Sequence, residues 1–287
     1  MLQVESQGLV DTESQSHGPR ISGVLQAGGQ GLADISEGLA NWRIWWMFAW
    51  NDVRRRYRRS GLGQFWLTLS MAATVGGLGL VYSRLFHTDV TKYLPYISVT
   101  FVGWGLISTL VIDSCTAFTE NESLLRHVYL PRSLLVFRVM ARTFVVAAHN
   151  VLIIPIVFAI FHVGVNANIL WLAAGLPLVI VNGFWFGFFL AIVCARFRDV
   201  PQIVTSIMQV VFFITPVMFL PEQLSQRGIS VLRWSPFASL LEVLSAPVLG
   251  SRPSDLALVM CATMAAIGFL LVLPFAGRYA PRAVYWL

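Results

Sequence analysis

Six long apolar stretches limit what this chain can fold into more than any other feature of its sequence. A helix needs roughly 20 apolar residues to cross a hydrocarbon core of about 30 Å. The chain is 56% hydrophobic and 12% charged, whereas soluble domains carry about 25% charged residues. The sequence therefore predicts an all-α integral membrane protein with six transmembrane helices. We place them at residues 65–86, 94–118, 139–162, 169–195, 201–220 and 256–275.

The distribution of arginine between alternate loops predicts the orientation. Lys92 is the only lysine, so the formal net charge of +6 rests on arginine. Basic residues beside apolar spans favour the cytoplasmic side of the membrane. Their position in short loops is therefore explained by the orientation of the chain, without nucleic-acid binding. We therefore expect no nucleic-acid partner and both termini in the cytoplasm. The arginines assigned to the cytoplasmic side are Arg43, Arg54, Arg55, Arg56, Arg58, Arg59, Arg126, Arg132, Arg196, Arg198, Arg278 and Arg282, against Arg84, Lys92, Arg227, Arg233 and Arg252 outside.

The chain before the first span divides into two parts. Residues 1–40 are rich in Gly, Ser, Gln and Glu without a sustained apolar period, which predicts a disordered cytoplasmic tail. Residues 41–287 form the predicted membrane domain. At its start, Trp residues and then Arg residues precede the first span, and Trp favours the membrane–water interface. Five apolar residues recur at helical spacing: Trp42, Trp45, Trp46, Ala49 and Val53. This pattern predicts a helix that lies flat on the membrane with its apolar face in the headgroup layer.

Asp113 is a carboxylate within the second predicted span, near its cytoplasmic end. Arg138 and Arg142 lie at a similar depth around the start of the third span. An ion pair between the two helices would offset the cost of placing these charges in the membrane. Extension of each side chain separately toward water is the alternative, and the sequence leaves both open.

Residues 119–130 predict a short helix in a cytoplasmic connection. Thr119 and Glu122 have the spacing of a capping box, in which each side chain binds the other residue's backbone N–H group. Pro131 requires the helix to end before it. A capped amphipathic helix suggests a docking surface for a soluble partner, and a solvated turn is the alternative. Its expected apolar side consists of Leu124, Leu125 and Val128.

Two further connections carry proline signals. In residues 196–201 we expect Asp199 to cap the fifth span and Pro201 to fall in its first turn. The apolar stretch 221–250, on the outer side, is divided by three prolines into pieces of about 10 to 14 residues. These pieces are too short to cross, which predicts interfacial or re-entrant helices at a gate-like location.

Residues for catalysis are missing from the sequence. A Gly-x-x-x-x-Gly-Lys-Ser/Thr phosphate loop is impossible because Lys92 is followed by tyrosine. Cys115, Cys194 and Cys261 stand apart from one another in apolar runs and are interpreted as small apolar side chains. We expect no cofactor or metal on this chain. Aromatic side chains are the candidate lining of a pathway that tolerates sugar faces: Tyr96, Phe101, Trp104, Phe184, Trp185, Phe188, Phe212, Phe213 and Phe219.

Five segments, spread in order along the chain, resemble those of a known family. They are residues 52–63 (DVRRRYRRSGLG), 196–201 (RFRDVP), 215–218 (TPVM), the pair 235–237 and 247–250 (SPF and PVLG), and 285–287 (YWL). The chain resembles the permease subunits of type-2 ABC transporters that export polysaccharides, the O-antigen and teichoic acid exporters.

The resemblance implies a homodimer of six-span subunits in the bacterial inner membrane, bound to two copies of a separate ATPase that holds ATP and Mg. Residues 42–59 correspond to an interface helix, 120–129 to a coupling helix and 221–250 to two outer gate helices. The residues expected to couple to the ATPase are Glu120, Glu122, Leu124, Leu125, Arg126, Val128, Arg196, Arg198 and Asp199.

The implied substrate is a lipid-linked glycan on an undecaprenyl diphosphate or similar anchor. Arginine binds phosphate well, so the diphosphate is expected to meet Arg54, Arg55, Arg56, Arg58 and Arg59. Export of teichoic acid, a drug or a small lipid by the same fold is the nearest alternative. An integral-membrane transferase is a more distant one, since it would need a polar catalytic cluster that the sequence lacks.

Overall fold

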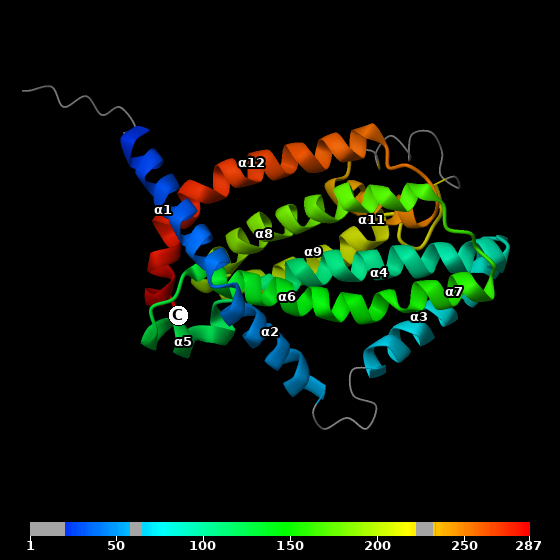
Figure 1. Cartoon of the computed structure of the whole chain (residues 1–287), viewed down its shortest axis with the longest axis horizontal. Coiled ribbons are helices and arrows are strands. Elements are labelled where there is room, and N and C mark those ends of the chain that lie inside the picture. The colour runs from blue at the N-terminus through cyan, green and yellow to red at the C-terminus, as the bar shows by residue number, and fades with distance from the viewer. Residues whose placement is uncertain (1–20, 58–64, 222–231, 233) are drawn as a thin grey trace, which may run out of the picture.

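The computed structural model describes residues 21–57, 65–221, 232 and 234–287, and every element in these ranges is a helix (Figure 1). The elements in order are α1 (Ile21–Ala40), α2 (Trp42–Tyr57), α3 (Phe65–Leu85), α4 (Val90–Cys115), η1 (Thr119–Asn121), α5 (Glu122–His127), α6 (Arg132–Val151), α7 (Ile153–Ile160), η2 (Ala167–Trp171), α8 (Leu172–Arg196), α9 (Val200–Ile214), α11 (Pro236–Val248), α12 (Asp255–Tyr279) and η4 (Ala280–Tyr285).

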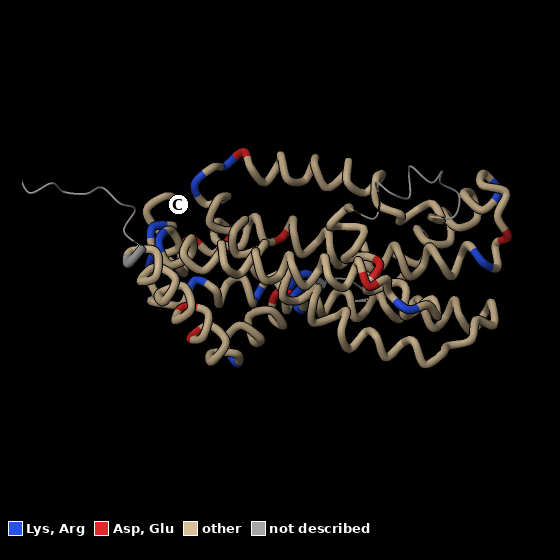
Figure 2. The backbone as a smooth tube through the Cα atoms, turned by 90° about the horizontal axis from the view of Figure 1, so that it is seen from above, with Lys and Arg blue, Asp and Glu red and all other residues tan. Residues whose placement is uncertain are grey.

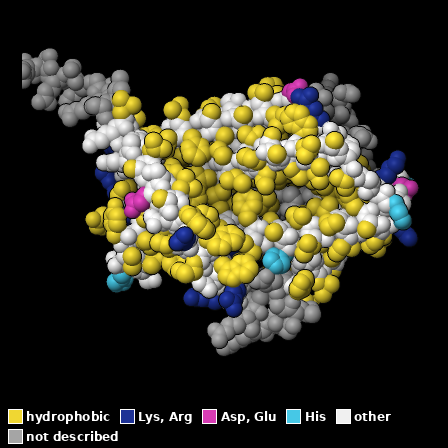
Figure 3. Space-filling view, viewed as in Figure 1, with side chains coloured by type: hydrophobic (Ala, Val, Ile, Leu, Met, Phe, Trp, Pro, Cys, Tyr) yellow, Lys and Arg dark blue, Asp and Glu magenta, His cyan; other side chains and the backbone are white. Residues whose placement is uncertain are grey.

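Five of the six predicted spans are confirmed as helices long and apolar enough to cross a membrane. Figure 2 shows the charged residues gathered near helix ends and connections, and Figure 3 shows a largely hydrophobic face. Such a surface suits contact with lipid. The five are α3, α4, α6 with α7 (Arg132–Ile160), η2 with α8 (Ala167–Arg196), and α12 with η4 (Asp255–Tyr285).

The fifth predicted span, 201–220, is too long. The helix found there, α9, has 15 residues, which is about 22 Å at 1.5 Å per residue. It ends at Ile214 because Pro216 lacks an N–H group and disfavours helix at Thr215.

Hydroxyl groups of α4 bind the irregular backbone that follows α9. The Tyr96 Oη atom lies 2.7 Å from the Pro216 carbonyl oxygen and 2.9 Å from that of Phe219. Thr100 donates a 2.8 Å hydrogen bond to the carbonyl of Val217, and the Tyr93 hydroxyl binds Met218. Carbonyls left free by the end of a helix are costly at membrane depth, so these bonds stabilise the break.

The central helix α4 buries most of its side chains and α8 buries 11 of its 25 residues, and α4 packs against α3, α6, α8 and α11. Phe188 and Ile192 of α8 are almost fully buried, as are Leu134 and Leu135 of α6. The three cysteines are buried and free, which confirms their interpretation as small apolar side chains.

The prediction of a disordered tail over residues 1–40 is wrong for its second half. Residues 21–40 form α1, which packs against α12 and α6, whereas residues 1–20 lie outside the described residues. A Cβ atom built on Gly31 would lie 2.2 Å from the Leu273 carbonyl oxygen, so only glycine allows this approach. The helix thus packs through small residues together with Ile35, which is buried on the same side.

Asp34 of α1 caps α6 from outside that helix. Its two carboxylate oxygens accept 2.8 Å hydrogen bonds from the backbone N–H groups of Arg132 and Ser133. Pro131, the residue at the N-cap position of α6, has no acceptor in its side chain. Asp34 therefore satisfies two N–H groups that the local sequence leaves without partners.

The apolar face predicted for α2 divides into two. Ala49 and Val53 are buried, and α2 packs against α6, where the Trp45 ring lies 5.9 Å from that of Phe137. Trp42 and Trp46 are exposed, together with Trp50. The expectation that all five residues share a lipid-facing side is therefore wrong, because four-residue spacing places 45, 49 and 53 on one stripe and 42, 46 and 50 on the next.

Alanine at Gly277 should separate α1 from α12. Its methyl group would lie 1.8 Å from the Ala27 carbonyl oxygen, and overpacking of this kind costs about 1–3 kcal/mol. Gly29→Ala is the matched control, since no heavy atom lies within 4 Å of its Cβ position and helix propensity alone favours the change. In thermal unfolding of the purified protein, Gly277→Ala should lower the midpoint and Gly29→Ala should not. Equal midpoints would contradict the close crossing.

Candidate functional site

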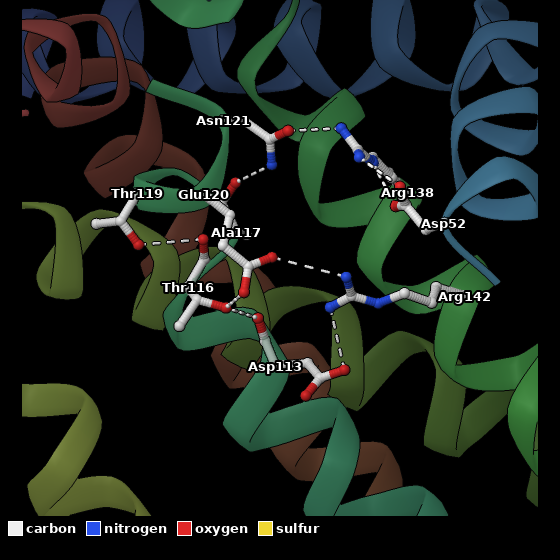
Figure 4. Close-up of polar contacts among 9 residues, drawn as sticks. All are labelled: Asp52, Asp113, Thr116, Ala117, Thr119, Glu120, Asn121, Arg138 and Arg142. Atoms are coloured by element: carbon white, nitrogen blue, oxygen red, sulfur yellow. Dashed lines mark hydrogen bonds and ion pairs between the residues drawn. The ribbon is translucent and has the colours of Figure 1, made fainter. Parts of the chain in front are cut away.

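A network of charged and amide side chains joins α2, α4, η1 and α6 at the end of the bundle that carries α5, here called the α5 end (Figure 4). Arg142 of α6 pairs with Asp113 of α4 at 3.1 Å and with Glu120 of η1 at 3.6 Å. The Arg142 side chain is 13% exposed and that of Asp113 is 25% exposed. The ion pair that the sequence left open is thus formed, and Arg142 is the partner of Asp113.

Arg138, one turn before Arg142 on α6, joins three elements. Its Nε and Nη2 atoms donate 2.7 Å hydrogen bonds to the two carboxylate oxygens of Asp52 on α2, a bidentate arrangement that fixes the guanidinium plane. Its Nη1 atom donates to the amide oxygen of Asn121, whose own NH₂ group donates to the Ala117 carbonyl at 2.8 Å. A movement of η1 would therefore reach α6 and α2 directly.

The short helix α5 begins at Glu122, but the predicted capping box is absent. The Thr119 hydroxyl donates to the Thr116 carbonyl at 3.2 Å, and the residue before α5, Asn121, makes no side-chain cap. Glu122 pairs instead with Arg126 at 2.9 Å. A 3-10 turn over Thr119–Asn121 takes the place of the cap, so this part of the prediction is wrong.

Only part of the predicted apolar side of α5 faces outward. Leu125 is buried in the core, Leu124 is half-buried, and Val128 is 46% exposed after the helix end at His127. Tyr129, at 81% exposed, extends the surface away from the bundle. A partner at this end would meet Arg126, Val128 and Tyr129 rather than the leucines.

The connection at residues 196–201 lies at the same end as the C-terminus. The Arg196 guanidinium lies 5.1 Å from the centre of the Trp286 ring, and η4, next to Trp286, packs against α5 (Figure 1). Pro201 is in the first turn of α9, as predicted, but Asp199 makes no side-chain cap there. Arg198 and Asp199 are exposed.

Three of the five arginines expected to meet a diphosphate are described. Arg54, Arg55 and Arg56 are exposed in the last turn of α2. Arg58 and Arg59 lie outside the described residues. The role of this group in binding phosphate stays a prediction.

Of the nine predicted pathway aromatics, three are buried, five are half-buried and one is exposed. Trp104, Phe184 and Phe188 are buried, and Phe184 stacks on Phe137 at 4.5 Å between ring centres. Trp185 donates to Asn182 at 3.0 Å, while Tyr96 binds the backbone after α9. Phe101, Phe212 and Phe219 are half-buried. Phe213, at 71% exposed, is the one that faces away from the protein.

The exposed side of α9 carries a polar stripe that was not among the predicted site residues. Gln202, Ser206 and Gln209 are exposed at spacings of four and three residues, and Phe213 continues the stripe. Amide side chains facing lipid are costly, so this side of α9 suits an aqueous pathway or another subunit. The spacing was visible in the sequence, but which side of α9 the bundle covers was not.

The outer segment 221–250 is described in part. Its second piece forms α11, which is too short to span, as predicted, and is largely buried. The loop after it is held by Asn166 and Asn168, whose amide groups donate 2.7 Å hydrogen bonds to the Gly250 carbonyl. Gly250 has a φ of +87°, which favours glycine. Residues 222–231 and 233, which would hold the first predicted gate helix, lie outside the described residues.

This all-helical bundle of apolar spans is typical of a multi-pass membrane permease. The chain belongs to the ABC-2 type transporter family, whose family model matches residues 43–249. It is similar to the O-antigen export system permease protein RfbA of Klebsiella pneumoniae, with 19% identity over 66% of this chain and 74% of the relative. A protein of the same name from Myxococcus xanthus is 26% identical over 58% of this chain and 65% of its own length. The polysialic acid transport protein KpsM of Escherichia coli is 22% identical over 67% and 76%.

Removal of Arg138 should destabilise the α5 end. Arg138→Leu leaves the Asp52 carboxylate and the Asn121 amide oxygen without their donor in a partly buried place, at a cost of about 1–3 kcal/mol. Arg126→Leu is the control, because its pair with Glu122 is about half exposed and such pairs contribute at most about 0.5 kcal/mol. Denaturant unfolding of the purified protein measures both. Equal losses would refute the proposed role of Arg138 in joining the elements.

Proposed function

We propose that this chain is the membrane-spanning subunit of an ATP-driven exporter of lipid-linked polysaccharide. The observation that carries the proposal is the α5 end of an ABC-2 family permease, where the η1 turn that precedes a short helix with an exposed side is tied to α6 by the Glu120–Arg142 ion pair and by the Asn121–Arg138 hydrogen bond. The names of its relatives, O-antigen export permeases and a polysialic acid transport protein, support a glycan substrate.

ATP hydrolysis would be supplied by a separate ATPase, two copies of which bind a homodimer of this chain. The sequence lacks a phosphate-binding loop, so ATP and Mg belong to the partner. The partner docks at α5 and at the exposed turn carrying Arg198 and Asp199. The α5 end then faces the cytoplasm of a bacterium, and the permease lies in its inner membrane.

Force reaches the spans through the arginines of α6. Closure of the ATPases moves α5 and η1, and Glu120 and Asn121 of η1 are bonded to Arg142 and Arg138. The same two arginines hold Asp113 of α4 and Asp52 of α2, so three elements shift together. Such a rigid connection suits a switch between a closed and a conducting packing.

The translocation pathway lies between the two copies, against the polar stripe of α9. Gln202 and Gln209 offer amide groups to sugar hydroxyls, and Phe213 offers a ring to a sugar face. Such contacts tolerate many sugars. The diphosphate of the lipid anchor would meet Arg54, Arg55 and Arg56 as it leaves the inner leaflet.

Changing the exposed side of the α5 segment should uncouple the permease from its ATPase. Val128→Asp with Tyr129→Ala removes an apolar docking surface without touching the buried Leu125, so ATP-driven glycan export should fall by at least about tenfold. Val165→Asp, exposed at the opposite end of the bundle, is the control. Export is measured in cells and in proteoliposomes at matched protein levels. Unchanged export by the double variant would overturn the coupling role.

Apolar substitution of the α9 stripe should impair export without loss of the ATPase. Gln202→Leu with Gln209→Leu removes two hydrogen-bonding groups worth about 0.5–1.5 kcal/mol each, so export should fall by about threefold or more. Val210→Leu, at an exposed position on the same helix, should leave export unchanged. The measurement is glycan export, with co-purification of the ATPase as a check on assembly. Normal export by the glutamine variant would place the pathway elsewhere.

A further inference from the structure

Figure 1 shows α1 crossing the end of α12. A basic pocket lies at this crossing. It has a volume of about 700 Å³, within the range of pockets that hold small ligands. Its wall carries two guanidinium groups and two amide groups, while glycine, alanine, valine and proline complete the lining. The polar groups are those of Arg278, Arg282, Gln26 and Gln30.

The two arginines are charged groups without an acidic partner in the described part of the chain. Arg126, Arg138, Arg142 and Arg252 each pair with a carboxylate, but no described carboxylate lies within 4 Å of the side chain of Arg278 or Arg282.

The Tyr279 ring lies between the two arginines in sequence and contacts both, with its centre 5.8 Å from the guanidinium carbon of Arg278 and 6.0 Å from that of Arg282. These cation–π contacts help to hold two positive charges beside one cavity.

The position of the pocket matches the headgroup level of a bilayer. It begins in the last turn of α12, the most hydropathic span of the described chain, and tyrosine at such a position is typical of the membrane–water interface. The flank of α12 leading to it exposes Ile267, Leu270 and Leu271 at 53%, 73% and 64%, a surface that suits acyl chains.

We infer that this pocket binds the headgroup of an anionic phospholipid of the surrounding leaflet. Guanidinium groups bind phosphate through charge-assisted hydrogen bonds, and basic residues beside the end of a transmembrane helix attract anionic lipid headgroups. The glutamine amides donate to the remaining phosphate or glycerol oxygens. A lipid held here bridges α1 and α12 at the crossing that Gly31 and Gly277 make possible.

A resident phospholipid is favoured over the diphosphate of a transported lipid by the packing of the helices. α12 packs against α1, α8 and α11, whereas α9, which carries the polar stripe, packs against α4 and α8. The pocket is therefore on a different flank from the proposed pathway. Its occupant stabilises the fold rather than passing through it, whatever the protein transports.

The test is lipid retention by the full-length protein, purified with its co-purifying partners and examined by native mass spectrometry after incubation with dioleoylphosphatidylglycerol or dioleoylphosphatidylcholine. Phosphatidylglycerol should be retained and phosphatidylcholine should not. Arg278→Gln with Arg282→Gln should lower phosphatidylglycerol retention by about tenfold or more. Arg43→Gln with Arg84→Gln, which removes the same charge from other exposed sites, should retain it as the unmodified protein does.

Three results would overturn the inference. Equal loss in both double variants would mean that net charge alone attracts the lipid. Equal retention of the two lipids by the unmodified protein would mean that the pocket does not distinguish an anionic headgroup from a zwitterionic one. Displacement of bound phosphatidylglycerol by farnesyl diphosphate, but not by added phosphatidylglycerol, would assign the pocket to a diphosphate ligand.

A circular dichroism spectrum and a thermal midpoint for each variant separate these results from misfolding. A further variant, Gln26→Leu with Gln30→Leu, keeps every charge and should weaken retention of phosphatidylglycerol by about threefold.

Discussion

Pairing of Arg138 and Arg142 with carboxylates from other helices is the interaction on which the α5 end depends. A charge removed from water is costly unless it is paired and hydrogen-bonded, and these two guanidinium groups lie one turn apart among apolar helices. Asp52 and Asp113 neutralise them, and Glu120 and Asn121 take up further N–H groups. The same bonds that make the arginines tolerable also fix the η1 turn, which carries α5, to the body of the bundle.

Backbone carbonyl groups at the opposite end of the bundle also need partners when they are removed from water. The chain after α9 leaves the helical conformation, and hydroxyl groups of Tyr93, Tyr96 and Thr100 bind its carbonyls. Side chains of α4 thus do what helical hydrogen bonds do elsewhere. This explains why a helix of 15 residues can be part of a membrane bundle, and why Tyr96 is a structural residue before it is a candidate for contact with substrate.

The sequence predicted the long apolar helices correctly but not the helix α1 or the start of α5. Long apolar runs revealed α3, α4, α6 with α7, α8 and α12 because burial in lipid requires about 20 apolar residues whatever the neighbours are. The helix α1 was missed because its packed side consists largely of Gly31 and Gly38 with Ile35, and glycine-rich composition is typical of segments that do not form a helix. The capping box at Thr119 failed because each of its two side chains has another partner: the Thr119 hydroxyl donates to the Thr116 carbonyl, and Glu122 pairs with Arg126.

The sequence by itself determined that this is a helical membrane protein, roughly where its spans lie, its family, and that a short helical segment begins near residue 119. These properties depend on composition and on short-range spacing, which a chain carries into any packing. The tertiary structure decided that Asp113 pairs with Arg142, that Arg138 pairs with Asp52, and that Phe184 is buried while Phe213 is exposed. Partners far apart in the chain and the covered side of each helix depend on how helices cross, and crossing is set by the fit of whole surfaces.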